Sequence, residues 1–219
     1  MYEEYKMIDL HTHSLLSDGA LLPSELVRRA YVVGYKAIGI AEHVDTSNID
    51  FVVPRVVKAS KALTSSKIRV IPAVELTHVP LKDIPKLIKY ARTNDIKLIL
   101  VHGETISEPV IPGTNTCALE NDIDILAHPG LVTLKEAKVA AKRKIYLELT
   151  SKKAHSFTNG HVARIALQAK AQLIFNTDAH NPEDLISYNL AKLIILGSGL
   201  SESQTKEVFK NSLRLLKKI

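Results

Sequence analysis

The chain has 219 residues, of which 46% are hydrophobic and 24% charged, and its formal charge at pH 7 is +6. This composition argues against disorder, and the length suits one domain over residues 1–219. The single Cys117 excludes an internal disulfide, and neither a signal core nor an apolar run of membrane-spanning length is found, so we expect a cytoplasmic protein with no membrane partner.

Seven short runs rich in β-branched residues or leucine predict strands at near-regular intervals. In chain order they cover residues 6–10, 37–41, 69–76, 97–101, 123–127, 145–149 and 172–176. The segments between them have the apolar spacing of helices, as in Leu26, Val27 and Ala30 behind Pro23. Strands that alternate with helices imply a parallel sheet with helices outside it. Residues 202–219 predict a last amphipathic helix that closes or covers the barrel.

Histidines and carboxylates recur at or just beyond the C-terminal ends of these predicted strands. They are His11, His13, His43, Glu75, His102, His128, Asp178 and His180. In a (β/α) barrel the reactive groups converge at that edge, whereas structural histidines have no reason to recur there. The pairs His11 and His13, and Asp178 and His180, have the period of an extended chain, so both members of each pair can face one side.

Imidazole nitrogens together with carboxylate oxygens suit Zn, Mn or Fe. The set is larger than one tetrahedral ion uses, so we expect more than one ion. A carboxylate such as Glu75 can bridge two ions, and a paired site of this kind can promote in-line displacement at phosphorus.

The sequence resembles the PHP (polymerase and histidinol phosphatase) superfamily of metal-dependent phosphoesterases, and in particular its small, stand-alone histidinol-phosphatase-like members. The resemblance covers essentially the whole chain. Its motifs stand here as Asp9-Leu10-His11-Thr12-His13 with Ser17-Asp18-Gly19, Glu42-His43, Glu75, His102-Gly103-Glu104, Ala127-His128-Pro129-Gly130 and Thr177-Asp178-Ala179-His180.

The resemblance implies a distorted seven-stranded (β/α) barrel, similar to a TIM barrel, that holds two to three divalent metal ions. It assigns His11, His13, Glu75 and Asp178 to a first site, Glu75, His102 and His128 to a second, and Asp18, His43 and His180 to a third. Several members have Thr-Asp-His where this chain has Ala41-Glu42-His43, and some use a histidine in place of Asp18. The extra carboxylate favours Mn or Fe over Zn at the third site.

The activity that the resemblance implies is a phosphatase in which a hydroxide bridging two metals attacks phosphorus. Glu75, Asp178 and His180 are the expected catalytic residues, and His180 or His155 can protonate the leaving group. We expect a small phosphorylated metabolite, such as histidinol phosphate or a nucleotide, because one compact domain leaves little room for a long groove. Candidate substrate contacts are His155 and Lys153 after the sixth strand, and Arg55 at the start of the second helix.

Two alternatives remain open. The basic surface would suit an exonuclease or phosphodiesterase that acts on nucleic acid, although 5% aromatic residues and no Trp give few platforms for stacking bases. The other is a non-catalytic subunit of an RNA-processing complex, a role that would tolerate loss of the metal ligands, which this chain retains.

Three acidic residues outside the expected ligand set also bear on the site. Asp9 and Glu42 are candidates to accept hydrogen bonds from ligand imidazoles, although strand alternation points them the other way. Glu148 lies within the sixth strand and needs a partner if it faces the interior. His78 and His161 are expected to be structural.

Overall fold

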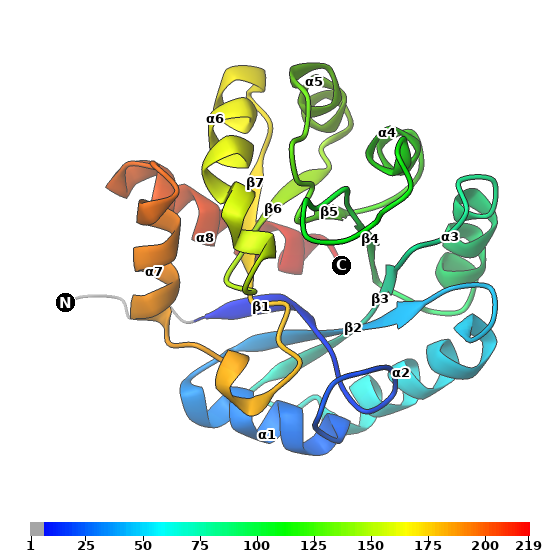
Figure 1. Cartoon of the computed structure of the whole chain (residues 1–219). Helices are drawn as coiled ribbons and strands as arrows, with labels where there is room; N and C mark the ends of the chain where they lie inside the picture. Colours follow the sequence, from blue (N-terminus) through cyan, green and yellow to red (C-terminus); the bar gives the residue numbers. More distant parts are fainter. Residues whose placement is uncertain (1–6) are drawn as a thin grey trace.

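Seven parallel strands form one sheet in the order β1-β2-β3-β4-β5-β6-β7 in the computed structural model, which describes residues 7–219 (Figure 1). The strands are β1 (Ile8–Thr12), β2 (Ala37–Val44), β3 (Arg69–Leu76), β4 (Leu98–His102), β5 (Ile125–Ala127), β6 (Tyr146–Thr150) and β7 (Leu173–Asn176). The helices are α1 (Pro23–Val33), α2 (Ile49–Leu63), α3 (Ile84–Thr93), α4 (Thr114–Leu119), α5 (Leu134–Arg143), α6 (Asn159–Ala169), α7 (Tyr188–Gly197) and α8 (Glu202–Lys218), with short 3₁₀ turns η1 (His155–Thr158) and η2 (Pro182–Asp184). The predicted strand at 6–10 begins at a residue outside the described part of the chain.

The sheet curves until β1 lies beside β7, so the predicted seven-stranded α/β barrel is confirmed and nearly closed (Figure 1). The junction between β1 and β7 is irregular. The backbone N–H groups of His13 and Asp178 donate to the carbonyls of Ala179 and His11, at 2.8 and 2.9 Å. Lower down, the N–H of Leu10 donates to the side-chain Oδ1 of Asn176 at 2.8 Å. A side chain thus replaces part of the backbone ladder where the barrel is distorted.

The interior positions of the strands change from apolar to polar towards their C-terminal ends. In β3, Ile71 and Ala73 belong to the inner apolar cluster, and alternation brings Glu75 to the same side. In β4, Leu98 and Leu100 are followed in the same way by His102. Each strand therefore contributes to an apolar layer first and to a polar layer above it.

The far end of the barrel interior is closed by α8. Leu215 is 1% exposed and belongs to the inner cluster with Ile8, Leu98 and Tyr146. Arg69, the first residue of β3, donates through Nη1 to the carbonyl of Leu216 at 2.8 Å. Figure 1 shows α8 crossing behind the strands. The predicted terminal helix therefore closes the barrel at the end opposite to the polar layer.

Helices surround the sheet, and their apolar faces pack on the outward-facing strand residues, such as Ile38 and Ile40 of β2. Between residues 7 and 219, none of these helices has both the length and the apolar character that a membrane crossing requires.

Candidate metal centre

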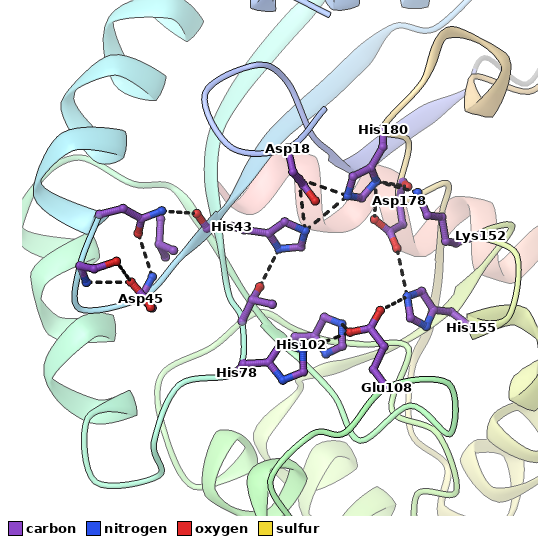
Figure 2. Close-up of a pocket in the computed structure, with 14 residues that line it drawn as sticks. Asp18, His43, Asp45, His78, His102, Glu108, Lys152, His155, Asp178 and His180 are labelled. Atoms are coloured by element: carbon purple, nitrogen blue, oxygen red, sulfur yellow. Dashed lines mark hydrogen bonds and ion pairs between the residues drawn. The ribbon is translucent and has the colours of Figure 1, made fainter. Parts of the chain in front are cut away.

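A cavity of about 620 Å³ opens over the polar layer, at the C-terminal ends of the strands (Figure 2). All of its lining residues except Val44 have polar or charged side chains. The lining consists of Asp18, His43, Val44, Asp45, Ser47, Asn48, Thr77, His78, His102, Glu108, Lys152, His155, Asp178 and His180. Further histidines and Glu75 lie beneath these residues and are buried. The barrel edge predicted to carry the reactive groups is thus where they converge.

The four residues expected at a first site lie together at the floor of the cavity. Nε2 of His11 is 3.2 Å from Oε2 of Glu75, and Nε2 of His13 is 3.2 Å from Oδ1 of Asp178. Their side chains are 0–3% exposed. Ligand atoms of His11, His13 and Asp178 all lie within 4.8 Å of one another, a spacing that can hold an ion.

The residues expected at a third site lie at one wall. Oδ1 of Asp18 is 3.5 Å from Nε2 of His43 and 3.3 Å from Nε2 of His180 (Figure 2). With His13 they form a second group whose ligand atoms lie within 4.8 Å of one another. The Asp18 side chain is 55% exposed, so this group is open to the cavity.

More side chains with possible ligand atoms surround the expected second site than the sequence predicts. Nε2 of His128 lies 3.5 Å from Oε1 of Glu75, and these two group with His11. His102 groups with His128 and His155, and separately with His78 and Glu108. Glu108 does not belong to the pattern of ligands at strand ends, because it lies in the loop between β4 and α4, six residues beyond the end of the strand.

The donor set fits divalent cations. Several buried site atoms have no hydrogen-bond partner in the described structure: Nε2 of His11, both ring nitrogens of His13 and His128, both carboxylate oxygens of Glu75, and Oδ1 of Asp178. Buried polar atoms are costly to leave unpaired, and they converge on shared points. Ions coordinated by these nitrogens and oxygens would satisfy them.

The charges of these groups depend on one another. Burial would raise the pKa of Glu75 and of Asp178, but the positive charge of His11 outweighs it and holds both pKa values well below their usual range. Burial together with the neighbouring His43 lowers the pKa of His13 to about 3. His13 is therefore neutral near pH 7 and has a lone pair available for an ion.

Backbone strain is concentrated around the same groups. Four residues without a glycine's freedom have positive φ at this end of the barrel: His78 (53°), His128 (27°), Ala154 (69°) and Asp178 (54°). Such conformations cost about 1–3 kcal/mol each and persist where surrounding contacts impose them. At His128 and Asp178 the strained residue is itself an expected ligand.

Each of the three acidic residues outside the expected ligand set has hydrogen-bond partners. Glu148 faces the interior, where Oε1 lies 2.9 Å from Nδ1 of His11. Asp9 accepts hydrogen bonds from the backbone and hydroxyl of Thr177, joining β1 to the chain after β7. Glu42 accepts from Ser14 and from the Ser17 hydroxyl, which anchors the segment that carries Asp18.

Of the three candidate substrate contacts, one lines the cavity and two do not. His155 lines the cavity. Lys153 is exposed and does not line it, whereas its neighbour Lys152 does, with Nζ 2.8 Å from Nδ1 of His180. The guanidinium of Arg55 lies 3.4 Å from the centre of the Phe51 ring and donates to the Phe51 carbonyl, away from the cavity lining.

His161 lies outside the cavity lining, where Nε2 donates to the carbonyl of Val132 at 2.8 Å and Nδ1 accepts from Nη2 of Arg164 at 3.3 Å, so its contacts are those of a structural residue. His78 differs, because it lines the cavity and lies 3.1 Å from Glu108.

Comparison of the sequence with those of known proteins identifies a family profile and a close relative. Residues 9–172 match the sequence profile of the PHP domain. An uncharacterized protein of Methanocaldococcus jannaschii, MJ1295, is 44% identical over 199 residues, which cover 90% of this chain and 91% of that protein.

Two solved structures share the fold. One, in archaeal ribonuclease P with mature tRNA, has a TM-score of 0.71 at 15% identity and covers 95% of this chain and 90% of the other. The other is the histidinol phosphate phosphatase of Lactococcus lactis, complexed with zinc, L-histidinol and phosphate. It has a TM-score of 0.62 at 14% identity, and the match covers 90% of this chain and 95% of the phosphatase. These likenesses concern the fold. The profile match over most of the chain, together with the 44% identical relative, shows that the chain belongs to the PHP domain family.

Proposed function

We propose that the protein is a metal-dependent phosphatase that hydrolyses a small phosphorylated metabolite. The observation that carries the proposal is the layer of buried, unpartnered imidazole and carboxylate atoms beneath a cavity with one ammonium group at its edge. His11, His13, Glu75 and Asp178 would hold one ion, His102 and His128 a second with Glu75, and Asp18, His43 and His180 a third. When bound, such ions activate water near neutral pH and neutralise phosphate oxygens.

Lys152 is suited to bind a substrate phosphate. Nδ1 of His180 lies 2.9 Å from the carbonyl of Asp178 and 2.8 Å from Nζ of Lys152. If His180 uses Nε2 as a ligand, Nδ1 holds the proton and donates it to that carbonyl. An N–H cannot also accept from an ammonium group, so Lys152 would be released towards an incoming phosphate.

The size and charge of the cavity support a small substrate. About 620 Å³ is within the usual range for pockets that enclose small molecules. Lys152 is the one Lys or Arg among the described residues that line it. Most of the basic side chains of α5, including Lys138 and Lys142, are exposed on an outer helix. A nucleic-acid backbone at the cavity would find few cationic partners there.

Turnover by the purified protein tests the proposal. p-Nitrophenyl phosphate, bis(p-nitrophenyl) phosphate and a 5′-phosphorylated oligonucleotide would each be supplied with Mn²⁺, Zn²⁺ or Fe²⁺, followed by a panel of phosphorylated metabolites. We expect turnover of the monoester that is lost in Asp178→Asn. Preference for the diester or oligonucleotide would favour the nuclease alternative, and no turnover with any ion would overturn the proposal.

A further inference from the structure

The carboxylate of Glu108 is surrounded by three imidazoles on one wall of the cavity (Figure 2). Oε2 lies 3.1 Å from Nε2 of His78 and 3.2 Å from Nε2 of His102. Oε1 lies 3.3 Å from Nε2 of His155. The four residues come from the ends of β3 and β4, the loop after β4, and the turn after β6, so the tertiary fold alone brings them together.

The outer nitrogens of two of these rings indicate which atoms hold protons. Nδ1 of His102 lies 3.2 Å from the Gly103 carbonyl, which can only accept. Nδ1 of His155 lies 2.9 Å from both the Thr105 and Ser107 hydroxyls. The carbonyl places the proton of a neutral His102 on Nδ1, and the hydroxyls, which can accept or donate, allow the same tautomer in His155. Each ring then directs the lone pair of Nε2 at Glu108. A lone pair facing a carboxylate oxygen is repelled unless a positive charge lies between them.

The spacing suits a metal ion as that charge. Ligand atoms about 2.0–2.1 Å from a tetrahedral zinc ion lie about 3.3 Å from one another. Oε2 of Glu108 is 3.2 Å from Nε2 of His102 and Oε1 is 3.3 Å from Nε2 of His155, so each oxygen lies at a ligand–ligand distance from one ring. Glu108 groups with His78 and His102, and a further donor lies beside His102 and His155, because the buried Nε2 of His128 has no hydrogen-bond partner in the described structure. Ligand atoms of His102, His128 and His155 lie within 4.8 Å of one another.

We infer that Glu108 and His155 are direct ligands of the second ion, together with His102 and His128. This inference rests on the proposed metal-dependent function. It adds a carboxylate from the loop after β4 and an imidazole from η1 to the ligands that the sequence assigns to this ion. His155 is then a ligand and not a substrate contact. The Glu108 side chain is 37% exposed and lines the cavity, so it is the most accessible of these four residues to an incoming phosphate.

The test measures ion binding in the full chain without substrate. Glu108→Gln removes the anionic ligand, and His155→Asn removes Nε2 while keeping an amide donor near Thr105. Glu120→Gln, an exposed acid outside the cavity lining, is the matched control. Each protein would be stripped with a chelator and titrated with Zn²⁺, bound zinc being counted by mass spectrometry. Co²⁺ would be added in a parallel titration, because its visible absorption reports the number and type of ligands.

We expect both variants to bind one of the zinc ions at least about tenfold more weakly than the wild type, and to lose the same Co²⁺ absorption component. The control should match the wild type, and circular dichroism would establish that all variants are folded. Unchanged stoichiometry, affinity and spectrum in Glu108→Gln would overturn the inference and leave protons as the charges between Glu108 and the imidazoles. If the wild type binds zinc but hydrolyses no phosphoester, the proposed function fails while the ligand assignment stands.

Discussion

Oε1 of Glu148 lies 2.9 Å from Nδ1 of His11, and neither side chain is exposed to solvent. The same carboxylate accepts from Nδ2 of Asn176 at 2.7 Å and from the backbone N–H of His128 at 3.1 Å. A group that only accepts fixes the proton of His11 on Nδ1. When the positively charged His11 gives up a proton to an ion, Nε2 is therefore the nitrogen that is left unprotonated, and it is directed at Glu75.

Glu148→Gln should weaken binding of the first ion. An amide whose oxygen takes the place of Oε1 accepts from His11 and Asn176 without the negative charge, and it turns its NH₂ group towards the N–H of His128, so one of the three hydrogen bonds is lost. We expect the dissociation constant for one Zn²⁺ to rise about 10–100-fold in a chelator competition titration. Glu120→Gln serves again as the exposed control. Equal affinities in the two variants would show that Glu148 does not orient His11.

The strands and the expected ligands were predictable because both repeat with the barrel. Each unit supplies an apolar run and then a polar residue at its end, so the sequence pattern alone located Glu75 and His102 at the correct edge. The acidic partner of His11 was not predictable in the same way. The sequence shows that Glu148 needs a partner if it faces the interior, but its position in mid-strand does not identify His11, which is 137 residues away, as that partner.

Irregular backbone also turns residues to a side of the strand that regular alternation does not predict. From Leu10 in the inner cluster, regular alternation would direct His11 outward, but the pairing of β1 with β2 shifts register between Asp9 and Thr12. His128 follows Ala127 of the inner cluster and has φ of 27°. Neither departure has a signature in residue type. Glu108 and Lys152 were missed for a related reason, since loop conformation selects them from among similar neighbours.

Ion binding should release protons. Burial opposes protonation of His43, His102 and His180, but nearby carboxylates outweigh it, and the pKa of each is raised above its ordinary value. At pH 6.5, the ordinary pKa of an imidazole, these rings are therefore mostly protonated in the metal-free protein, and a ligand nitrogen must give up its proton. Apparent affinity should rise with pH, by up to about tenfold per unit for each proton released.

Calorimetric Zn²⁺ titrations in two buffers with different ionisation enthalpies would measure that release. The heat of binding should differ between the buffers at pH 6.5 and converge as the pH rises above the raised imidazole pKa values. Identical heats in the two buffers at pH 6.5 would contradict the protonated state assigned to these rings.

Gly130 holds the segment after His128 against the loop after β4. It has φ of +59°, and a Cβ placed there would lie 1.8 Å from the carbonyl oxygen of Glu104. Gly130→Ala must therefore move backbone, and we expect a loss of at least about 2 kcal/mol in the free energy of unfolding. Gly197, the last residue of α7, has open space around its Cβ position, so Gly197→Ala should be neutral or stabilising by up to about 1 kcal/mol. Urea unfolding compares the two, and equal stabilities would refute the close approach.

Replacing Lys152 should weaken substrate binding more than replacing Lys153, the next residue in the loop after β6. Lys152 lines the cavity beside His180, whereas Lys153 is exposed outside it. A hydrogen bond to a charged group contributes about 1.5–3 kcal/mol, so Lys152→Ala should raise KM for a phosphate monoester about 10–100-fold, and Lys152→Arg should restore part of the loss. Lys142→Ala, on the outer helix α5, controls for net charge. A larger KM increase in Lys153→Ala than in Lys152→Ala would return the phosphate contact to Lys153. It would also imply that the loop after β6 rearranges when substrate binds, because Lys153 lies outside the cavity lining in the present conformation.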